Sequence, residues 1–189
     1  MTLSRITTRR LVLRPIRMED AAAMIELGGK DFEVARWMTS FPWPYEEGAV
    51  EGFLQSVLGE GAAANAAVFA ITLGGIFIGL VSIEVPGELS GEGIDHPTIG
   101  YWLGRPFQGF GYGSEAAQAA VEWGFENHTC DAIAARVFED NKASRGLLRK
   151  LGFKPFGKTQ RYSRALDRKI DNVVVCLTRN DFDMQRAVA

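Results

Sequence analysis

The chain has 189 residues, 47% of them hydrophobic, and its composition does not change abruptly along its length. That size suits one domain with a sizeable core, so we expect residues 1–189 to form a single domain. With 21 basic and 23 acidic residues the net charge is −2, which gives no strong field to attract nucleic acid or an anionic membrane. We therefore expect neither as a partner.

The two cysteines, Cys130 and Cys176, have neither the close spacing of a metal site nor the density of a disulfide framework. Such sparse cysteine use is typical of a reducing compartment. Residues 1–10 carry charge but no apolar stretch of signal-peptide length. We expect a cytoplasmic protein without a metal ion, in which both cysteines fill apolar space.

The N-terminal third predicts a strand followed by two helices. Arg10 to Pro15 alternates polar and apolar residues and stops at proline, as a strand does. Helical spacing begins at Met18, and Gly28-Gly29 should end that helix. A second helix should cover Glu46 to Leu58, with an apolar stripe made of Val50, Phe53, Leu54, Val57 and Leu58. Between the helices, Trp37 to Tyr45 is rich in aromatic residues and proline.

Residues 61–83 contain no charged residue and are long enough to cross a bilayer. However, Leu73-Gly74-Gly75 divides them into two runs rich in β-branched and aromatic residues, Val68 to Thr72 and Ile76 to Ile83. This pattern predicts a buried β-hairpin with a glycine turn instead of a membrane helix.

The C-terminal half alternates strands and helices after a loop at Pro86 to Pro97. The expected elements are a strand at Thr98 to Leu103, a helix at Gly111 to Asn127, a strand at Ala132 to Phe138, a helix at Asn141 to Leu151 closed by Gly152, and a strand at Val173 to Thr178. Hairpins followed by helical crossovers predict an α/β (α+β) fold, in which a mixed sheet has helices on both faces.

The strongest local signal is Gln108-Gly109-Phe110-Gly111-Tyr112-Gly113, between a predicted strand and a predicted helix. Alternate glycines let backbone N–H groups converge, and the start of a helix adds a partial positive charge. These features favour a phosphate or pyrophosphate, although such a turn can also serve close packing alone. A P-loop would need a lysine after Gly113, and Ser114 stands where a dinucleotide fingerprint has its third glycine.

Several motifs occur in an order that resembles one enzyme family. Gln108-x-x-Gly111-x-Gly113 follows Ile99-Gly100-Tyr101-Trp102-Leu103 and precedes Asp140-Asn141-x-x-Ser144 and Leu151-Gly152-Phe153. This series resembles the GNAT acetyltransferase superfamily along most of the chain. Further segments are similar to the branch that contains the RimJ- and RimL-type protein N-terminal acetyltransferases, namely Thr8-Arg9-Arg10-Leu11-Val12-Leu13-Arg14-Pro15, Phe41-Pro42-Trp43-Pro44 and Leu177-Thr178-Arg179.

The resemblance implies a mostly antiparallel twisted sheet of six to seven strands with a splayed central strand pair. It also implies acetyl-coenzyme A as co-substrate. Tyr101, Trp102 and Leu103 would pair with its pantetheine arm, and one of their N–H groups would polarise the thioester carbonyl. The loop Gln108, Gly109, Phe110, Gly111, Tyr112 and Gly113, with Ser114, would hold the pyrophosphate, and Asn141 and Ser144 would approach the sulfur.

Ser144 precedes three leucines on the apolar face of its predicted helix and should therefore point inward. Its hydroxyl either bonds back to a carbonyl of its own helix or donates a proton to the departing thiolate. Tyr162, in the less regular stretch after Phe153, is a second candidate acid, although an exposed or packing role suits it better.

The general base is left open by the sequence, because Thr98 occupies the position where many relatives have a glutamate. Glu84 and His96 are the nearby candidates, although Glu84 could simply face solvent and His96 could be a loop residue. A water relay would also serve. An N-terminal amine, with a pKa of about 7.7–8.0, needs less help from a base than a lysine amine at about 10.4.

The function favoured by the sequence is acetyl transfer from acetyl-coenzyme A to a primary amine, on a protein N-terminus or a small molecule. Trp37 to Tyr45 could form one wall of the acceptor pocket, or a hydrophobic plug. A homodimer is common among similar proteins. Two alternative functions remain. Because Thr98 replaces the expected glutamate, the chain could be a non-catalytic acetyl-coenzyme A-binding module, and because of its glycine-rich loop it could be an NAD(P)-dependent oxidoreductase.

Overall fold

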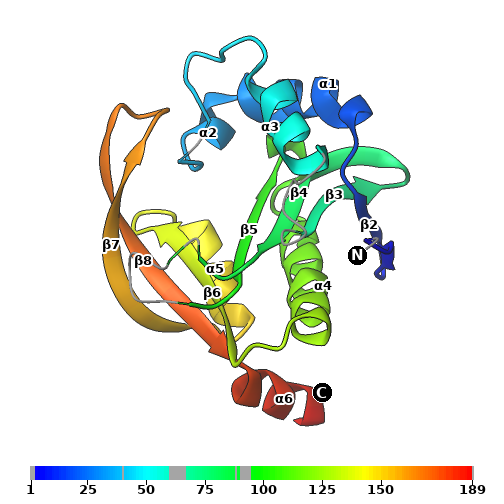
Figure 1. Cartoon of the computed structure of the whole chain (residues 1–189), viewed down its shortest axis with the longest axis vertical. Coiled ribbons are helices and arrows are strands. Elements are labelled where there is room, and N and C mark those ends of the chain that lie inside the picture. Colours follow the sequence, from blue (N-terminus) through cyan, green and yellow to red (C-terminus); the bar gives the residue numbers. More distant parts are fainter. Residues whose placement is uncertain (1–2, 40, 60–66, 88, 90–94, 189) are drawn as a thin grey trace.

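The computed structural model describes residues 3–39, 41–59, 67–87, 89 and 95–188. Their strands form one eight-stranded sheet in the order β1-β2-β3-β4-β5-β6-β8-β7 (Figure 1). The strands are β1 (Ile6–Thr7), β2 (Leu11–Pro15), β3 (Ala67–Leu73), β4 (Ile76–Glu84), β5 (Thr98–Leu103), β6 (Ala132–Phe138), β7 (Lys154–Ser163) and β8 (Arg168–Thr178). Every neighbouring pair is antiparallel except β5 and β6, which confirms a mixed, mostly antiparallel sheet.

The helical segments are η1 (Met18–Asp20), α1 (Ala21–Met24), η2 (Ile25–Gly29), α2 (Phe32–Ala35), α3 (Ala49–Leu58), η4 (Arg105–Phe107), α4 (Tyr112–Asn127), α5 (Lys142–Lys150) and α6 (Arg179–Val188). The helix expected from Met18 is confirmed, although it is divided into a 3₁₀ turn, an α-helical turn and a π-helical turn. None of these helices is long and apolar enough to span a bilayer. The described residues also include no cluster of three or more His, Cys, Asp or Glu side chains that could hold a metal ion.

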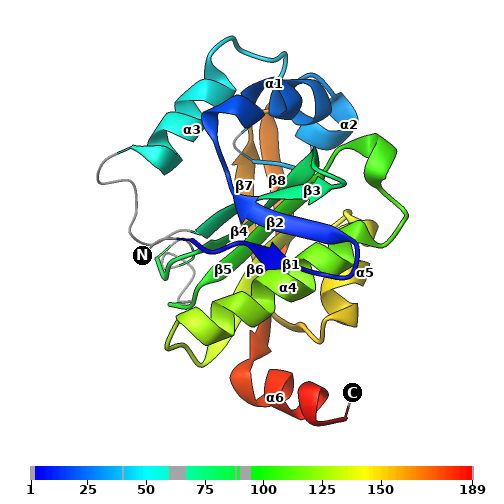
Figure 2. The ribbon, with the colours of Figure 1, turned by 90° about the vertical axis from the view of Figure 1, so that its right-hand side faces the viewer.

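Helices cover both faces of the sheet, as expected. Side chains alternate along β3, so Phe69 and Ile71 join the cluster beneath α4, whereas Val68 and Ala70 join the cluster beneath α1 and α3. Figure 2 shows α4 running along the sheet well apart from α1 and α3. The hairpin of β3 and β4 turns at Gly74-Gly75, where φ is 58° and 87°, which explains why glycine occupies both positions.

The parallel pair β5 and β6 separates soon after it forms. Within the described residues the two strands share a single pairing, Thr98 with Ala134, whereas β4 and β5 pair from Gly79–Leu103 to Glu84–Thr98. The central pair is therefore splayed, as the family resemblance implies. In the part of the chain that the structure describes, the edge of β5 that faces β6 has no strand partner beyond Thr98.

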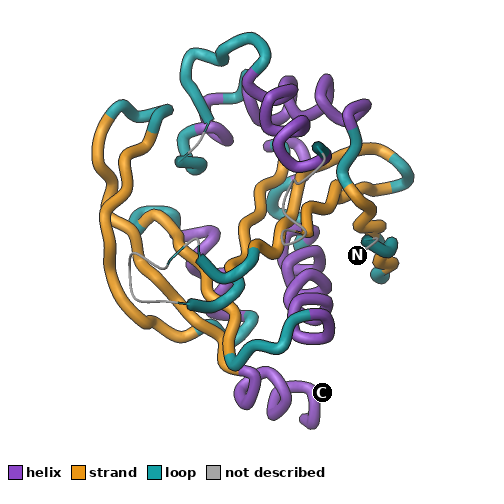
Figure 3. The backbone as a smooth tube through the Cα atoms, in the orientation of Figure 1, coloured by secondary structure: helices purple, strands orange, loops and turns teal. Residues whose placement is uncertain are grey.

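Five elements of the described chain were not expected from the sequence: β1, α2, η4, β7 and α6. The stretch after Phe153, expected to be less regular, is in fact the ten-residue strand β7. Most of its residues are exposed and polar residues occur on both of its faces, so it lacks the alternation that marks a half-buried strand. Figure 3 shows that β7 and β8 form a long curved hairpin at the edge of the sheet. β1, with two residues, makes the sheet one strand larger than expected.

The stripe expected on the second helix is wrong in part. Val50 and Leu54 are buried, but Phe53 and Leu58 are 39% and 45% exposed. α3 also begins at Ala49 instead of Glu46, because Gly48 takes a left-handed conformation with φ of 82° just before it. The first residues of the expected hairpin segment, 61–66, and residues 88 and 90–94 of the expected loop lie outside the described residues.

Candidate active site

A cleft of about 730 Å³ lies where β5 and β6 separate. One wall comes from the segments around α2 and α3, the other from α5 and the start of α4, and strands β4, β5 and β6 run between them. The lining of the cleft includes Trp37, Phe41, Phe53, Leu80, Ser82, Glu84, Gly100, Tyr101, Trp102, Leu103, Gln108, Gly109, Gly111, Gly113, Ser114, Phe138, Asn141 and Ser144.

Alternation along β5 divides the cleft into two sides. Tyr101 and Leu103 belong to the cluster beneath α4, where Leu147 of α5 also packs, and we call this the α5 side. Trp102 packs against the cluster beneath α1 and α3, and we call this the α2 side. Because the sheet is open between β5 and β6, groups on the two sides can reach the same point on β5.

On the α5 side, the glycine-rich loop presents backbone N–H groups at the start of α4. Gly109 and Gly111 have φ of 84° and 83°, in the left-handed region that favours glycine. Gly111 is the N-cap of α4, and no side chain caps this helix. The first N–H groups of the helix therefore point outward with the positive end of its dipole, which suits a phosphate. Gln108 anchors the loop through its Nε2, which donates to the Leu103 carbonyl at 2.9 Å.

An ion pair ties this loop to the N-terminal strands. Arg10 Nε lies 2.7 Å from Glu115 Oε2, while Arg10 Nη1 donates to the Phe110 carbonyl at 2.9 Å. Thr8 Oγ1 donates to the same carboxylate at 2.6 Å. Burial opposes ionisation of Glu115, but the hydrogen bonds from Thr8 and Arg10 outweigh it and hold the pKa of Glu115 below its ordinary value.

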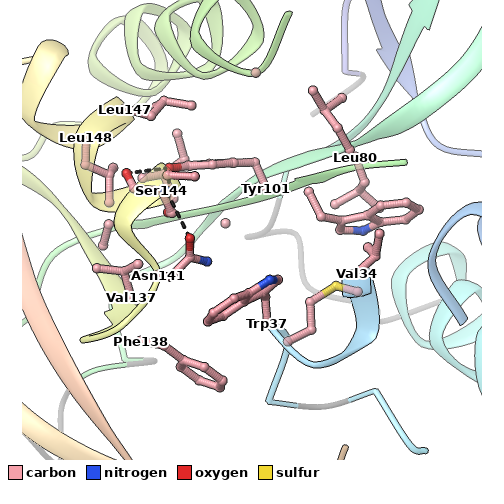
Figure 4. A pocket seen from close by; sticks show the side chains of 18 of the residues that line it. Val34, Trp37, Leu80, Tyr101, Val137, Phe138, Asn141, Ser144, Leu147 and Leu148 are labelled. Atoms are coloured by element: carbon pink, nitrogen blue, oxygen red, sulfur yellow. Dashed lines mark hydrogen bonds between the residues drawn. The ribbon is translucent and has the colours of Figure 1, made fainter. Parts of the chain in front are cut away.

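Ser144 and Tyr101 meet on the α5 side. Asn141 caps α5 by accepting from the Ser144 N–H at 3.1 Å, which places Ser144 in the first helical turn. The Ser144 Oγ lies 2.8 Å from the Tyr101 hydroxyl, so its partner is that phenol and not a carbonyl of its own helix (Figure 4). Burial raises the pKa of Tyr101 to about 12, and the hydrogen bond with Ser144 offsets only part of the rise. The phenol therefore stays protonated at neutral pH.

Glu84 lies on the α2 side, at the end of β4. It is only partly exposed, and Ser82 Oγ donates to its Oε1 at 3.3 Å. A Cβ on Gly100 would stand 3.1 Å from Ser82 Oγ and 4.0 Å from Glu84 Oε1. The missing side chain at Gly100 thus leaves room for the Ser82 hydroxyl that donates to the carboxylate, and it places Glu84 beside the backbone of β5.

The structure brings most of the expected site residues together, but not all. Phe110 and Tyr112 do not line the cleft; Phe110 is 61% exposed, and Arg10 stacks 4.5 Å from the Tyr112 ring centroid. Tyr162 is 52% exposed on β7 and donates to Asp167, so it lies outside the cleft. His96 does not line the cleft either.

Sequence reasoning missed many further residues of the lining, among them Leu80, Ser82 and Phe138. Each lies in a strand whose apolar run indicates only burial. Strand register then decides which residues reach the opening, and no local pattern carries that information.

Comparisons with known proteins agree with this geometry. Residues 10–154 match the family model described as "Acetyltransferase (GNAT) domain". A Bacillus licheniformis protein, "Uncharacterized N-acetyltransferase p20", is 29% identical over 179 residues, which are 93% of this chain and 96% of that protein.

Two solved structures resemble the chain over most of its length. Mycobacterium smegmatis RimJ, solved in complex with a coenzyme A disulfide, is 26% identical with a TM-score of 0.75, over 90% of this chain and 83% of that one. RimL, described as a ribosomal L7/L12 α-N-protein acetyltransferase in complex with coenzyme A, is 19% identical with a TM-score of 0.77. The match covers 94% of this chain and 99% of that chain. At that identity RimL shows a common fold alone.

Proposed function

Because the chain belongs to the GNAT acetyltransferase family and is an acetyl-coenzyme A-dependent acyltransferase, we propose that it acetylates a primary amine, and that this amine is a protein N-terminal α-amine. The observation that carries the proposal is a cleft open to both faces of the sheet, with Ser144 on one side and Glu84 on the other. Acetyl-coenzyme A, the acetyl donor, and the amine that accepts the acetyl group can then meet at β5 from opposite faces of the sheet. Direct transfer requires this, because the amine attacks the carbonyl carbon while the sulfur leaves.

The α5 side suits coenzyme A. Gly109, Gly111 and Gly113 line the cleft where the uncapped α4 begins, and we assign the pyrophosphate to their N–H groups and to Ser114. The free edge of β5 at Tyr101 to Leu103 offers backbone groups to the amide-bearing pantetheine arm. An N–H on this edge would also stabilise the oxyanion that forms when the amine attacks.

Glu84 is the base we propose. Thr98, where many relatives have a glutamate, pairs directly with Glu84 across β4 and β5, so the two residues project from the same face of the sheet. The carboxylate that Thr98 lacks is thus supplied by the neighbouring strand. Glu84 would accept the proton that the amine nitrogen loses as the C–N bond forms.

Ser144 is the acid we propose. Its position in the first turn of α5, beside the cleft, allows its hydroxyl hydrogen to reach a thiolate held on the α5 side. As the C–S bond breaks, the hydroxyl would pass its proton to the sulfur while it takes a proton from solvent water, so that no serine alkoxide accumulates. The positive end of the helix dipole would ease this transfer.

An N-terminal α-amine is the acceptor that this arrangement suits best. Its pKa of about 7.7–8.0 leaves a sizeable neutral fraction at physiological pH, so one carboxylate is enough as base. The similarity to RimJ supports the same choice. We propose a cytoplasmic location, since Cys130 and Cys176 are both free thiols.

The first test is the thermal stability of the protein with acetyl-coenzyme A, coenzyme A or NADP. A ligand that binds the native state raises the melting temperature, by an amount equivalent to about 2.7 kcal/mol at a hundredfold excess over Kd. Acetyl-coenzyme A and coenzyme A should stabilise the protein and NADP should not. Stabilisation by NADP alone would revive the oxidoreductase alternative and contradict the proposal.

The second test separates an enzyme from a non-catalytic binding module. Release of the coenzyme A thiol is followed with a thiol reagent while short peptides with free N-termini are supplied, and N-acetylated peptides without other amines serve as controls. Thiol release should require the free amine, and mass spectrometry should find one acetyl group per peptide. Tight binding of acetyl-coenzyme A without turnover on any amine would favour the binding module.

A further inference from the structure

The α2 side of the cleft is walled mainly by aromatic side chains. Trp37, Phe41, Phe53 and Trp102 line it, and all four keep part of their surface exposed, 39% in the case of Phe53. Phe138 of β6 lines the same wall and is buried. Aromatic surface that stays open inside a concave site is more typical of a binding pocket than of a core.

Four of these five rings form two pairs. Trp37 lies with its ring centroid 6.2 Å from that of Phe138, and the Phe41 centroid lies 6.4 Å from that of Trp102. Figure 4 shows Trp37 and Phe138 together at one end of the pocket, with Leu80 at the other end. Both pairs are tilted or edge-on, with interplanar angles of 60° and 70°. The Arg36 guanidinium already stands 4.8 Å from the Trp37 ring centroid, so a further planar group would pack against the rest of the exposed aromatic surface.

The two pairs are held in place by contacts outside the cleft. Trp102 lies over Gly28, where a Cβ would stand only 3.0 Å from its ring. The Arg164 N–H, at the tip of the β7–β8 hairpin, donates to the Thr39 carbonyl at 3.3 Å, and the Arg164 guanidinium pairs with Glu46 at 3.0 Å. The β7–β8 hairpin therefore contacts the chain between Trp37 and Phe41, at Thr39, and again after Phe41, at Glu46, and these contacts favour a pocket that is formed before an acceptor binds.

The Glu84 carboxylate lines this side of the cleft, and so does Arg136 of β6, from the same face of the strand as Phe138. The ammonium form of an amine would be attracted to the carboxylate and repelled by the guanidinium, which directs its nitrogen to Glu84. The acceptor must then place its nitrogen near Glu84 and a planar apolar group among the ring pairs.

We propose that the α2 side is an aromatic acceptor subsite, selective for a primary amine that has an aromatic ring a few bonds from its nitrogen. The inference rests on the proposed function and specifies its substrate. Such a group is supplied either by a peptide whose first residue is aromatic or by a small arylalkylamine. Both sources share the same chemistry, and the two arms of the experiment distinguish them.

The experiment compares kcat/KM for three peptides that differ only in the first residue, Phe, Leu or Ser, and for phenethylamine against 2-methoxyethylamine. The Phe peptide should exceed the Ser peptide by at least about tenfold, with Leu between them, because aromatic burial contributes more than aliphatic burial in a site with exposed rings. A preference seen only among the peptides points to a protein N-terminus, and one seen only among the small amines points to an arylalkylamine.

Variants test whether the aromatic pairs cause this preference. Trp37→Leu and Phe41→Leu should each reduce the Phe-to-Ser ratio of kcat/KM several-fold. Phe156→Leu is the matched control, since Phe156 is 60% exposed on β7 and does not line the cleft, and it should keep the ratio unchanged. Melting temperatures of all three variants with coenzyme A bound would show that the fold and the α5 side are intact.

A binding measurement is independent of turnover. With saturating coenzyme A present, phenethylamine should raise the melting temperature and 2-methoxyethylamine should not. Equal kcat/KM for the Phe and Ser peptides together with equal values for the two small amines would overturn the subsite while leaving the acetyltransferase proposal intact. Absence of thiol release with every amine would instead overturn the proposed function, and the subsite with it.

Discussion

The phenol oxygen of Tyr101, on β5, lies 2.8 Å from the hydroxyl oxygen of Ser144, in the first turn of α5. The same phenol also lies 3.4 Å from the Ser144 carbonyl oxygen, an atom that can only accept a hydrogen bond. The single phenol hydrogen therefore has two acceptors within reach, and either hydroxyl can donate across the 2.8 Å contact. The role we propose for Ser144 requires Tyr101 to donate to Ser144 Oγ, which leaves the Ser144 hydrogen for the departing sulfur.

Tyr101→Phe tests this relationship. Loss of one hydrogen bond to Ser144 should lower kcat by roughly five- to tenfold while the KM for acetyl-coenzyme A changes little, since a neutral hydrogen bond worth about 1 to 1.4 kcal/mol corresponds to that factor. Ser144→Ala should lower kcat by about a hundredfold. In the double variant the tyrosine change should cost nothing further, because it acts through Ser144.

Two results would contradict this role for Tyr101. If adding Tyr101→Phe to Ser144→Ala lowered kcat by a further five- to tenfold, Tyr101 would act as an acid independently of Ser144. If the variants lowered only the melting temperature and not kcat, the pair would have a structural role. Tyr162→Phe is the matched control, because it removes the same hydroxyl group from a tyrosine that lies outside the cleft. The kcat and KM of this variant should equal those of the parent protein.

Gly111→Asp tests the phosphate loop. A carboxylate at the N-cap of α4 would oppose the pyrophosphate, so the Kd for acetyl-coenzyme A should rise by more than about tenfold. Gly48→Asp is a matched control, because Gly48 is the N-cap of α3 with φ of 82° and has open space around its missing side chain. Titration calorimetry on both variants should separate lost affinity from backbone strain, and equal affinities would refute the loop assignment.

Glu84→Gln tests the base. The amide has almost the same shape but cannot accept a proton, so kcat/KM for a peptide should fall by about a hundredfold. The limb of the pH profile that reports the base should also disappear. Gly100→Val should have a similar effect on kcat, because its side chain would displace the Glu84 carboxylate and Ser82. Unchanged acetyl-coenzyme A affinity in both variants would show that only the α2 side is disturbed.

Glu115→Gln tests the brace between α4 and the N-terminal strands through pH. Because hydrogen bonds from Thr8 and Arg10 depress the pKa of Glu115 in the folded protein, the charged carboxylate adds stability above the ordinary glutamate pKa of about 4.3. That stability is lost as pH falls through the lowered folded pKa. Urea unfolding should therefore show the parent more stable than the variant at pH 7, with the difference shrinking below about pH 4.

Elements with strong local patterns were predicted well from the sequence. β5 spans Thr98–Leu103 as expected, and Gly152 takes the left-handed conformation with φ of 88° that its place after α5 predicts. β7 was missed because its exposed residues carry no apolar period. The inward direction of Ser144 followed from helical spacing, but its hydrogen-bond partner did not, since Tyr101 is 43 residues away.

The sequence by itself determined the parts of the site that depend on neighbouring residues, such as the glycines that turn the loop and the residue that caps α5. Only the tertiary structure decided that Glu84 faces Gly100, that Tyr101 meets Ser144 and that Trp37 pairs with Phe138. The physical reason is the distance along the sequence over which the responsible interactions act. Backbone conformation responds to residues within a few positions, whereas strand register and the divergence of β5 from β6 result from the packing of the whole sheet.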